Sequence, residues 1–176
     1  MDKFRQRALN DKTYMEYISD IYNDSNFAVM DKYEHHDTYT RLDHCIHVSY
    51  STYLLLKKLA PGYRYMREAC RGALLHDFFL YDWHTENPFP VPCMHAWKHP
   101  ERAYLDAKKY FEISPVEKHI ILTHMYPLYL GIPSSKAAWM VIWFDKYWAC
   151  REGFRSFSPL KMLKMQVPDS LKKKRK

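Results

Sequence analysis

Apolar residues recur at the spacing of an α-helix along most of the chain. In the first such stretch, residues 11–22, the side chains of Tyr14, Ile18 and Ile21 fall on one helical face. Similar periodicity, bounded by start and stop signals, predicts further helices over residues 38–60, 64–79, 100–112, 115–124 and 135–152. We therefore expect an all-α, single-domain helical bundle of about six main helices with no substantial sheet, in which residues 23–37 form a polar loop.

Proline and capping residues mark several helix ends. Pro61-Gly62 ends the second predicted helix, and Ser114-Pro115-Val116-Glu117 reads as a capping box with proline at the first helical position. Pro100 also suits a first helical position, which makes His99 the N-cap or the residue just outside the helix. Three prolines exclude a continuous helix over residues 81–98. This aromatic loop is either a lid beside a site or an ordinary packed loop.

Length and composition fit one folded domain. The chain has 176 residues, of which 47% are hydrophobic and only four are glycine, and this is enough for a substantial core. We expect an N-terminal helix and loop over residues 1–37, packed on a domain over residues 38–155, and an extension over residues 156–176 with a disordered basic tail. The tail contributes five charges to the net +7. It is either solvated or a weak contact for nucleic acid.

No targeting signal is visible in the sequence. The first residues are polar and charged, and no apolar run reaches the roughly 18–20 residues that a membrane span needs. The cysteines show neither CxxC spacing nor the pattern of a small disulfide-rich domain; they are Cys45, Cys70, Cys93 and Cys150. We therefore expect a protein of the reducing cytoplasm, with no membrane partner.

The chemistry of the chain begins with His76-Asp77, which lies inside the apolar run of residues 73–80. Burial of an uncompensated carboxylate costs several kcal/mol. Imidazole nitrogen and carboxylate oxygen together suit a transition metal, although a buried His–Asp hydrogen bond or salt bridge is the alternative. Asp145 is a second carboxylate beside an apolar run, because it directly follows residues 137–144. One shared cation is the simplest explanation of both carboxylates.

Five short motifs occur in one order over residues 38–150. They are Arg41-x-x-His44-x-x-x-Val48, Ala73-Leu74-Leu75-His76-Asp77, His99-Pro100, Ile121-x-x-His124 and Asp145-Lys146. This ordered set resembles the HD-domain superfamily of metal-dependent phosphohydrolases. The resemblance implies an all-α bundle and a metal bound by four residues, His44, His76, Asp77 and Asp145. In two-metal members, Asp77 would bridge the ions, and His99 and His124 would hold the second. The metal would be Fe, Mn, Ni, Co or Zn.

Other residues are candidates for contact with a substrate. Arg41 lies on nearly the same helical face as His44 and suits a phosphate, with a salt bridge to Glu34 or Asp37 as the alternative. Lys146 follows Asp145 and either reaches phosphate or is solvated. The aromatic loop adds three possible substrate contacts, Trp83, His84 and His95. His47 is a candidate to orient a ligating histidine.

These expectations combine into one function. We expect a hydrolase that cleaves a phosphate mono- or diester, or a phosphoanhydride, of a nucleotide by metal-activated water. Asp77 would fix the metal geometry, and Arg41 and Lys146 would stabilise the charge that develops on the phosphoryl group. A non-catalytic metal- or nucleotide-binding sensor or scaffold is the alternative, because one fold hosts many functions. Nucleic-acid binding through the tail is a third possibility, and the oligomeric state stays open.

Overall fold

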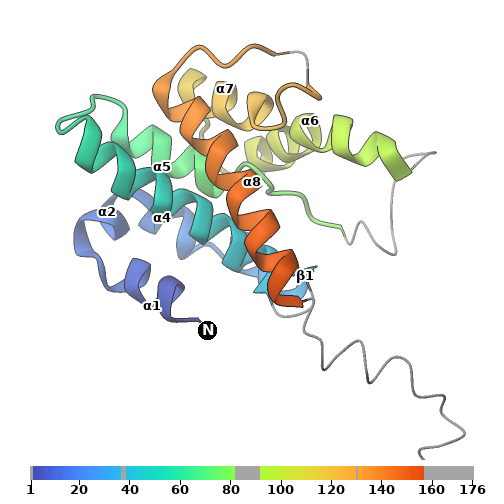
Figure 1. Ribbon diagram of the computed structural model, residues 1–176, viewed down its shortest axis with the longest axis horizontal. Coiled ribbons are helices and arrows are strands. Elements are labelled where there is room, and N and C mark those ends of the chain that lie inside the picture. Colours follow the sequence, from blue (N-terminus) through green and yellow to red (C-terminus); the bar gives the residue numbers. More distant parts are fainter. Residues whose placement is uncertain (1, 37–38, 82–91, 130, 157–176) are drawn as a thin grey trace, which may run out of the picture.

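The computed structural model describes residues 2–36, 39–81, 92–129 and 131–156, with side chains over residues 2–33, 39–81, 97–129 and 131–153. Helices dominate this part of the chain (Figure 1), which confirms the all-α, single-domain bundle. In chain order the elements are α1 Lys3–Asn10, α2 Lys12–Tyr22, α3 Ser25–Ala28, η1 Val29–Lys32, β1 Glu34–His36, β2 Tyr39–Thr40, α4 Arg41–Leu59, α5 Met66–Leu74, α6 Pro92–Tyr110, α7 Pro115–Thr123 and α8 Lys136–Ser156.

The N-terminal region is more regular than the sequence pattern predicts. Helix α1 was not expected, and the expected polar loop over residues 23–37 contains α3, η1 and β1, which pairs antiparallel with β2. Aspartates begin these helices: Asp2 accepts from the Arg5 amide at 2.8 Å, and Asp11 accepts from the Tyr14 amide at 3.2 Å. Asp24 likewise caps α3. Each cap satisfies amides that the first turn leaves unpaired.

Two predicted helix boundaries are wrong. Helix α5 ends at Leu74, so His76 and Asp77 lie in the turn that follows it and not inside a helix. Helix α6 begins at Pro92 and continues through Pro100, so residues 92–98 are helical and His99 is not a cap. A proline inside a helix removes one backbone hydrogen bond. It is tolerated here at a position where both His99 and Pro100 are buried.

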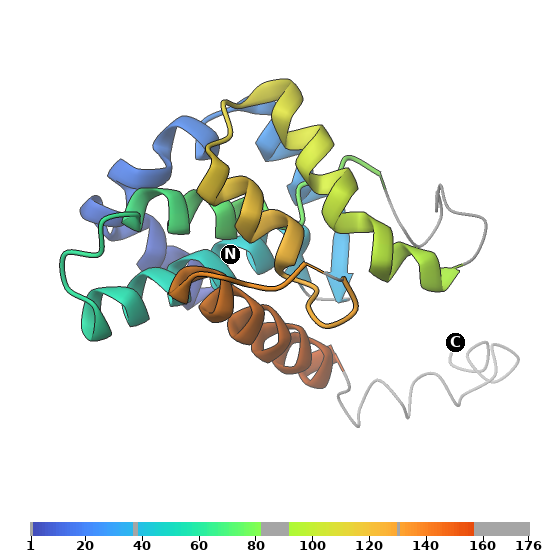
Figure 2. The same ribbon diagram turned by 90° about the horizontal axis from the view of Figure 1, so that it is seen from above.

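Helix α4 lies at the centre of the bundle. It packs against α5, α8 and α1, and its first thirteen residues are all buried. Helix α8 crosses α4, and α6 lies beside α7 (Figures 1 and 2). Two apolar clusters on either side of α4 and α5 form the core. Because α4 is buried and lies between α5 and α8, its polar side chains can meet those of segments that are distant in the sequence.

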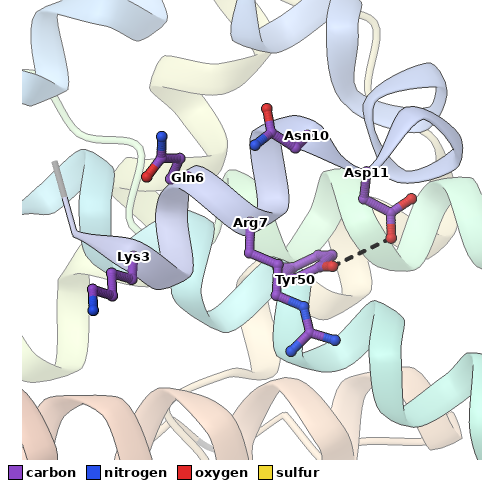
Figure 3. Close-up of a pocket in the computed structure, with 6 residues that line it drawn as sticks. All are labelled: Lys3, Gln6, Arg7, Asn10, Asp11 and Tyr50. Atoms are coloured by element: carbon purple, nitrogen blue, oxygen red, sulfur yellow. Dashed lines mark hydrogen bonds between the residues drawn. The ribbon is translucent and has the colours of Figure 1, made fainter.

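Side-chain contacts join the surrounding helices to α4 and α5. The Arg71 guanidinium of α5 pairs with Asp20 of α2 and Glu117 of α7, and donates to the Glu112 carbonyl at 2.9 Å. At the end of α1, the Tyr50 hydroxyl of α4 donates to Asp11 at 3.2 Å (Figure 3). None of the helices in the described ranges combines the length and hydrophobicity required to cross a membrane.

Candidate metal centre

The first turn of α4 sets the position of His44. Thr40 caps the helix: its hydroxyl accepts from the Asp43 amide at 3.2 Å, and Asp43 Oδ2 accepts from the Thr40 amide at 3.1 Å. Arg5 of α1 donates to the other oxygen of Asp43 at 2.8 Å. This capping box begins the helix immediately before His44, whose side chain is fully buried.

The turn after α5 presents His76 and Asp77. The His76 ring donates from Nδ1 to the Ala73 carbonyl at 2.7 Å, so Nε2 is the nitrogen that could ligate a metal. Two backbone hydrogen bonds close the turn, from the Phe78 amide to the Leu75 carbonyl and from the Phe79 amide to the Asp77 carbonyl, at 3.1 and 2.9 Å. The helix end therefore directs both polar side chains into the bundle interior.

One group of buried ligands joins α4, the turn after α5, and α8. Asp145 Oδ1 lies 3.2 Å from His44 Nε2 and 3.8 Å from His76 Nε2. The ligand atoms of these three residues all lie within 4.8 Å of one another. We call His44, His76 and Asp145 the first cluster.

A second group of buried ligands joins the turn after α5, α6 and the end of α7. Asp77 Oδ1 lies 3.2 Å from His99 Nε2 and 3.5 Å from His124 Nε2, and the two Nε2 atoms are 2.8 Å apart. His124 donates from Nδ1 to the Ile121 carbonyl at 2.7 Å, which leaves Nε2 toward Asp77. We call Asp77, His99 and His124 the second cluster.

Asp77 lies between the two clusters. Its Oδ1 faces His99 and His124, and its Oδ2 lies 3.7 Å from His76 Nε2 in the first cluster. The six predicted metal ligands thus meet at one place in the fold, from five separate parts of the chain.

Two buried atoms of this centre are suited to bind a cation. His76 Nε2 and Asp77 Oδ1 have no hydrogen-bond partner of acceptable geometry within the described residues. Such atoms normally find partners, since an unsatisfied buried polar group costs about 1–3 kcal/mol. Imidazole nitrogen and carboxylate oxygen are the ligands of zinc, manganese, iron, cobalt or nickel. The donor set therefore fits a divalent transition metal.

Both carboxylates are charged in this setting. Burial raises the pKa of Asp77, but the charge of His76 and the contact with His99 outweigh it and hold the pKa well below its usual value. For Asp145, burial acts in the same direction and is outweighed by His44 and His76, so the pKa is again held well below its usual value. Ionised carboxylates are the form that binds metal.

The imidazoles differ in their readiness to bind a cation. Burial lowers the pKa of His44, but hydrogen bonds to Asp145 and Glu152 outweigh it and raise the pKa to about 10. Burial and the neighbouring His99 lower the pKa of His124 to about 3. A metal must therefore displace a proton from His44, whereas His124 is already neutral at pH 7.

Glu152 is the residue of this centre that the sequence pattern did not reveal. Its fully buried carboxylate lies 2.8 Å from His44 Nδ1 and 2.7 Å from His47 Nδ1. The available signal was its spacing from Asp145, since seven residues are two turns of α8 and place both acids on one face. His47, the candidate for orienting a ligating histidine, contacts the same carboxylate as His44.

The predicted phosphate contact Arg41 is fully buried. Its NH1 and NH2 groups donate to the carbonyls of Phe79 and Tyr81 at 2.6 and 3.1 Å, and its guanidinium lies 3.8 Å from the centre of the Phe79 ring. This arrangement holds the segment that follows Asp77 against α4. Contact with a substrate stays a prediction for Arg41, and both terminal nitrogens have other partners in the structure.

Lys146 lies at the solvent side of the first cluster. Its side chain is 45% exposed, and Nζ lies 2.5 Å from Asp145 Oδ2 and 3.2 Å from Met125 Sδ. It is a half-exposed cation next to a predicted metal ligand, which is the position expected of a phosphate contact. The side chains of Trp83, His84 and His95 lie outside the described residues, so their predicted contacts with a substrate stay predictions.

Comparison of the chain with protein-family models, with curated proteins and with solved structures finds no match. The structure itself supports a helical bundle with two buried His/Asp clusters, each able to hold a metal ion.

Proposed function

We propose that this protein is a metal-dependent phosphohydrolase of the HD-domain type. The observation that carries the proposal is the pair of adjacent buried clusters next to Asp77, in which His76 Nε2 and Asp77 Oδ1 have no hydrogen-bond partner within the described residues. Carboxylates and imidazoles gathered in a protein interior are costly unless counter-charges or a cation compensate them. The order of the motifs along the chain supports the same family.

Each cluster would hold one divalent ion. The first ion would take His44, His76 and Asp145, and the second would take Asp77, His99 and His124, with Asp77 shared between them. A pair of bound ions would activate water and neutralise charge on a phosphate. Asp77 would add a fourth protein donor to the three of the first cluster, whereas the second cluster supplies three, fewer than the four of a closed structural zinc site, so the second ion would leave room for substrate or water.

The protein's own side chains would orient the reactants. Asp77, ionised and tied to both clusters, fixes their separation, and the turn after α5 holds it through Arg41. Lys146 would move from Asp145 to a phosphate oxygen and stabilise the charge that develops there. Its half-exposed position gives it access both to solvent and to the first cluster.

The substrate class that we propose is a nucleotide carrying a phosphate mono- or diester or a phosphoanhydride. A two-ion site favours phosphodiester or phosphoanhydride cleavage, because both the attacking and the leaving oxygen then have a cation. Nucleotide recognition would come from the predicted substrate contacts of the aromatic loop over residues 81–98, among them Trp83.

Hydrolysis of a panel of phosphoesters tests the proposal. The purified chain is assayed with phosphomonoesters, cyclic and linear diesters and nucleoside triphosphates, with Mn²⁺, Fe²⁺, Ni²⁺, Co²⁺ or no metal. We expect turnover that requires metal and that falls at least a hundredfold in Asp145→Asn. Lys118→Gln, which changes an exposed lysine on α7, is the control and should keep full activity.

The same assay separates the alternative function. A chain that binds metal and nucleotide with no turnover on any substrate would be a sensor or scaffold. Turnover that survives exhaustive chelation, or that Asp145→Asn leaves unchanged, would contradict the proposed mechanism.

A further inference from the structure

A buried carboxylate joins two histidines beside the first cluster. Glu152 Oε2 lies 2.8 Å from His44 Nδ1, and Oε1 lies 2.7 Å from His47 Nδ1. All three side chains have no exposed surface. Burial of a carboxylate and two imidazoles is costly unless each is well paired. The arrangement is therefore a specific polar network within the apolar packing between α4 and α8.

The network determines which nitrogen of His44 faces the first cluster. Because Glu152 accepts a hydrogen bond from Nδ1, that nitrogen carries the proton, and Nε2 is directed at Asp145, 3.2 Å away. A metal-ligating histidine needs a partner of this kind to fix its tautomer and ring orientation. A glutamine at position 152 could accept from only one imidazole and would donate to the other.

An ion-pair contact without hydrogen-bond geometry extends from His47 to the N-terminal helix. His47 Nε2 lies 2.9 Å from Asp2 Oδ2, while Asp2 Oδ1 caps α1 by accepting from the Arg5 amide at 2.8 Å. The His47 ring stacks on Trp148 of α8 with centroids 4.3 Å apart. Asp2 thus caps the N-terminus of α1 with Oδ1 and faces the buried His47 with Oδ2.

We propose that Glu152 and His47 are positioning residues for the ion of the first cluster, and that Asp2 links the docking of α1 to the occupancy of that ion. The inference rests on the proposed metal binding but not on hydrolysis. Linkage is reciprocal: if docked α1 strengthens metal binding, then metal binding must strengthen the docking of α1 by the same factor.

Metal titration tests the role of Glu152 directly. Wild type, Glu152→Gln and Glu117→Gln are titrated with Mn²⁺ by calorimetry, and the two binding steps are resolved. We expect Glu152→Gln to weaken one of the two ions about 10–100-fold and to leave the other within threefold of wild type. Glu117→Gln changes another buried glutamate, paired with Arg71, and should leave both ions unchanged.

Hydrogen exchange tests the link to α1 without a disruptive core substitution. Serine keeps the ability to cap α1 but lacks the second oxygen of Asp2, so Asp2→Ser separates capping from the contact with His47. The hydrogen bond from Tyr50 to Asp11 holds the other end of α1 in this variant (Figure 3). We expect Mn²⁺ to slow exchange of the α1 amides in wild type and to have little effect on them in Asp2→Ser.

Three outcomes would overturn the inference. One is Glu152→Gln binding both ions as wild type does, which would leave the proposed function intact. Another is exchange in α1 that does not respond to Mn²⁺ in wild type. The third is a wild-type chain that binds no metal, which would remove the proposed function as well. Metal binding with the expected loss in Glu152→Gln, but with no hydrolysis, would support the network and reject only the enzymatic function.

Discussion

Replacement of Asp77 by asparagine perturbs the residue that the two clusters share. The substitution keeps the size of the side chain and removes its charge. Asp77 Oδ1 lies 3.2 and 3.5 Å from two imidazole nitrogens of the second cluster, and Oδ2 lies 3.7 Å from His76 Nε2. Asp77 is the only carboxylate of the second cluster. We therefore expect Asp77→Asn to lose the second ion and to weaken the first.

The expected size of the effect follows from ligand linkage. An ion that binds only the folded chain stabilises it by about 2.7 kcal/mol when its concentration is a hundred times its Kd. Loss of one ion removes that gain, which corresponds to a melting temperature roughly 5–10 °C lower for a chain of this size. The metal-free variant is also less stable, by about 1–3 kcal/mol, because the imidazoles around Asp77 lose a charged partner.

Urea unfolding with and without Mn²⁺ measures both parts. The quantity of interest is the gain in the free energy of unfolding that metal confers, compared between variants. Asp106→Asn is the matched control, since Asp106 is also a buried aspartate, pairs with Arg102 and Lys109, and belongs to neither cluster. It should lower the stability of the metal-free protein and leave the metal-induced gain unchanged. An Asp77→Asn protein that gains as much from Mn²⁺ as wild type would refute the assignment of Asp77.

Three further predictions concern protonation and packing. The pKa of His44 is raised to about 10, so Mn²⁺ affinity should rise by about tenfold per pH unit for each proton displaced. For the same reason, the free energy of unfolding of the metal-free protein, measured in urea, should fall between about pH 6.5 and 10. An affinity independent of pH in calorimetric titrations would contradict this. Arg41→Met should lower the free energy of unfolding in urea by about 3 kcal/mol, since it leaves the Phe79 and Tyr81 carbonyls without their buried donors. A change below about 0.5 kcal/mol would be inconsistent with that role. In Gly72→Ala, the added Cβ would lie 3.1 Å from Ile120 Cβ, so α5 and α7 must separate. Thermal unfolding should then show a loss of about 1–3 kcal/mol in the free energy of unfolding, and an unchanged melting temperature would argue against this close approach.

The ligands of the clusters could be predicted because each interrupts or ends an apolar pattern. A carboxylate next to six apolar residues, as at Asp77, or eight, as at Asp145, has few physical explanations besides a cation or a buried pair. Glu152 gave no such signal. It stands in the polar stretch Arg151-Glu152-Gly153, which resembles the solvated end of a helix, and only its packing against α4 shows that it is buried.

The helix boundaries near the site could not be predicted for a related reason. The apolar run of residues 73–80 continues past the end of α5, because the turn that carries His76 is as deeply buried as the helix before it. Periodicity reports burial and does not distinguish a buried turn from a buried helix. The rule that places proline at the first turn likewise failed for Pro100, since α6 accommodates it in its interior.

The number of metal ions per chain tests the central claim most directly. Protein purified without chelator or nickel affinity resin is loaded with Mn²⁺, freed of unbound metal by gel filtration and analysed by mass spectrometry of the element. The two buried clusters predict two ions per chain, falling to one or fewer in Asp77→Asn. A wild-type chain that retains no metal, or that binds only one ion at saturation, would contradict a centre built from both clusters.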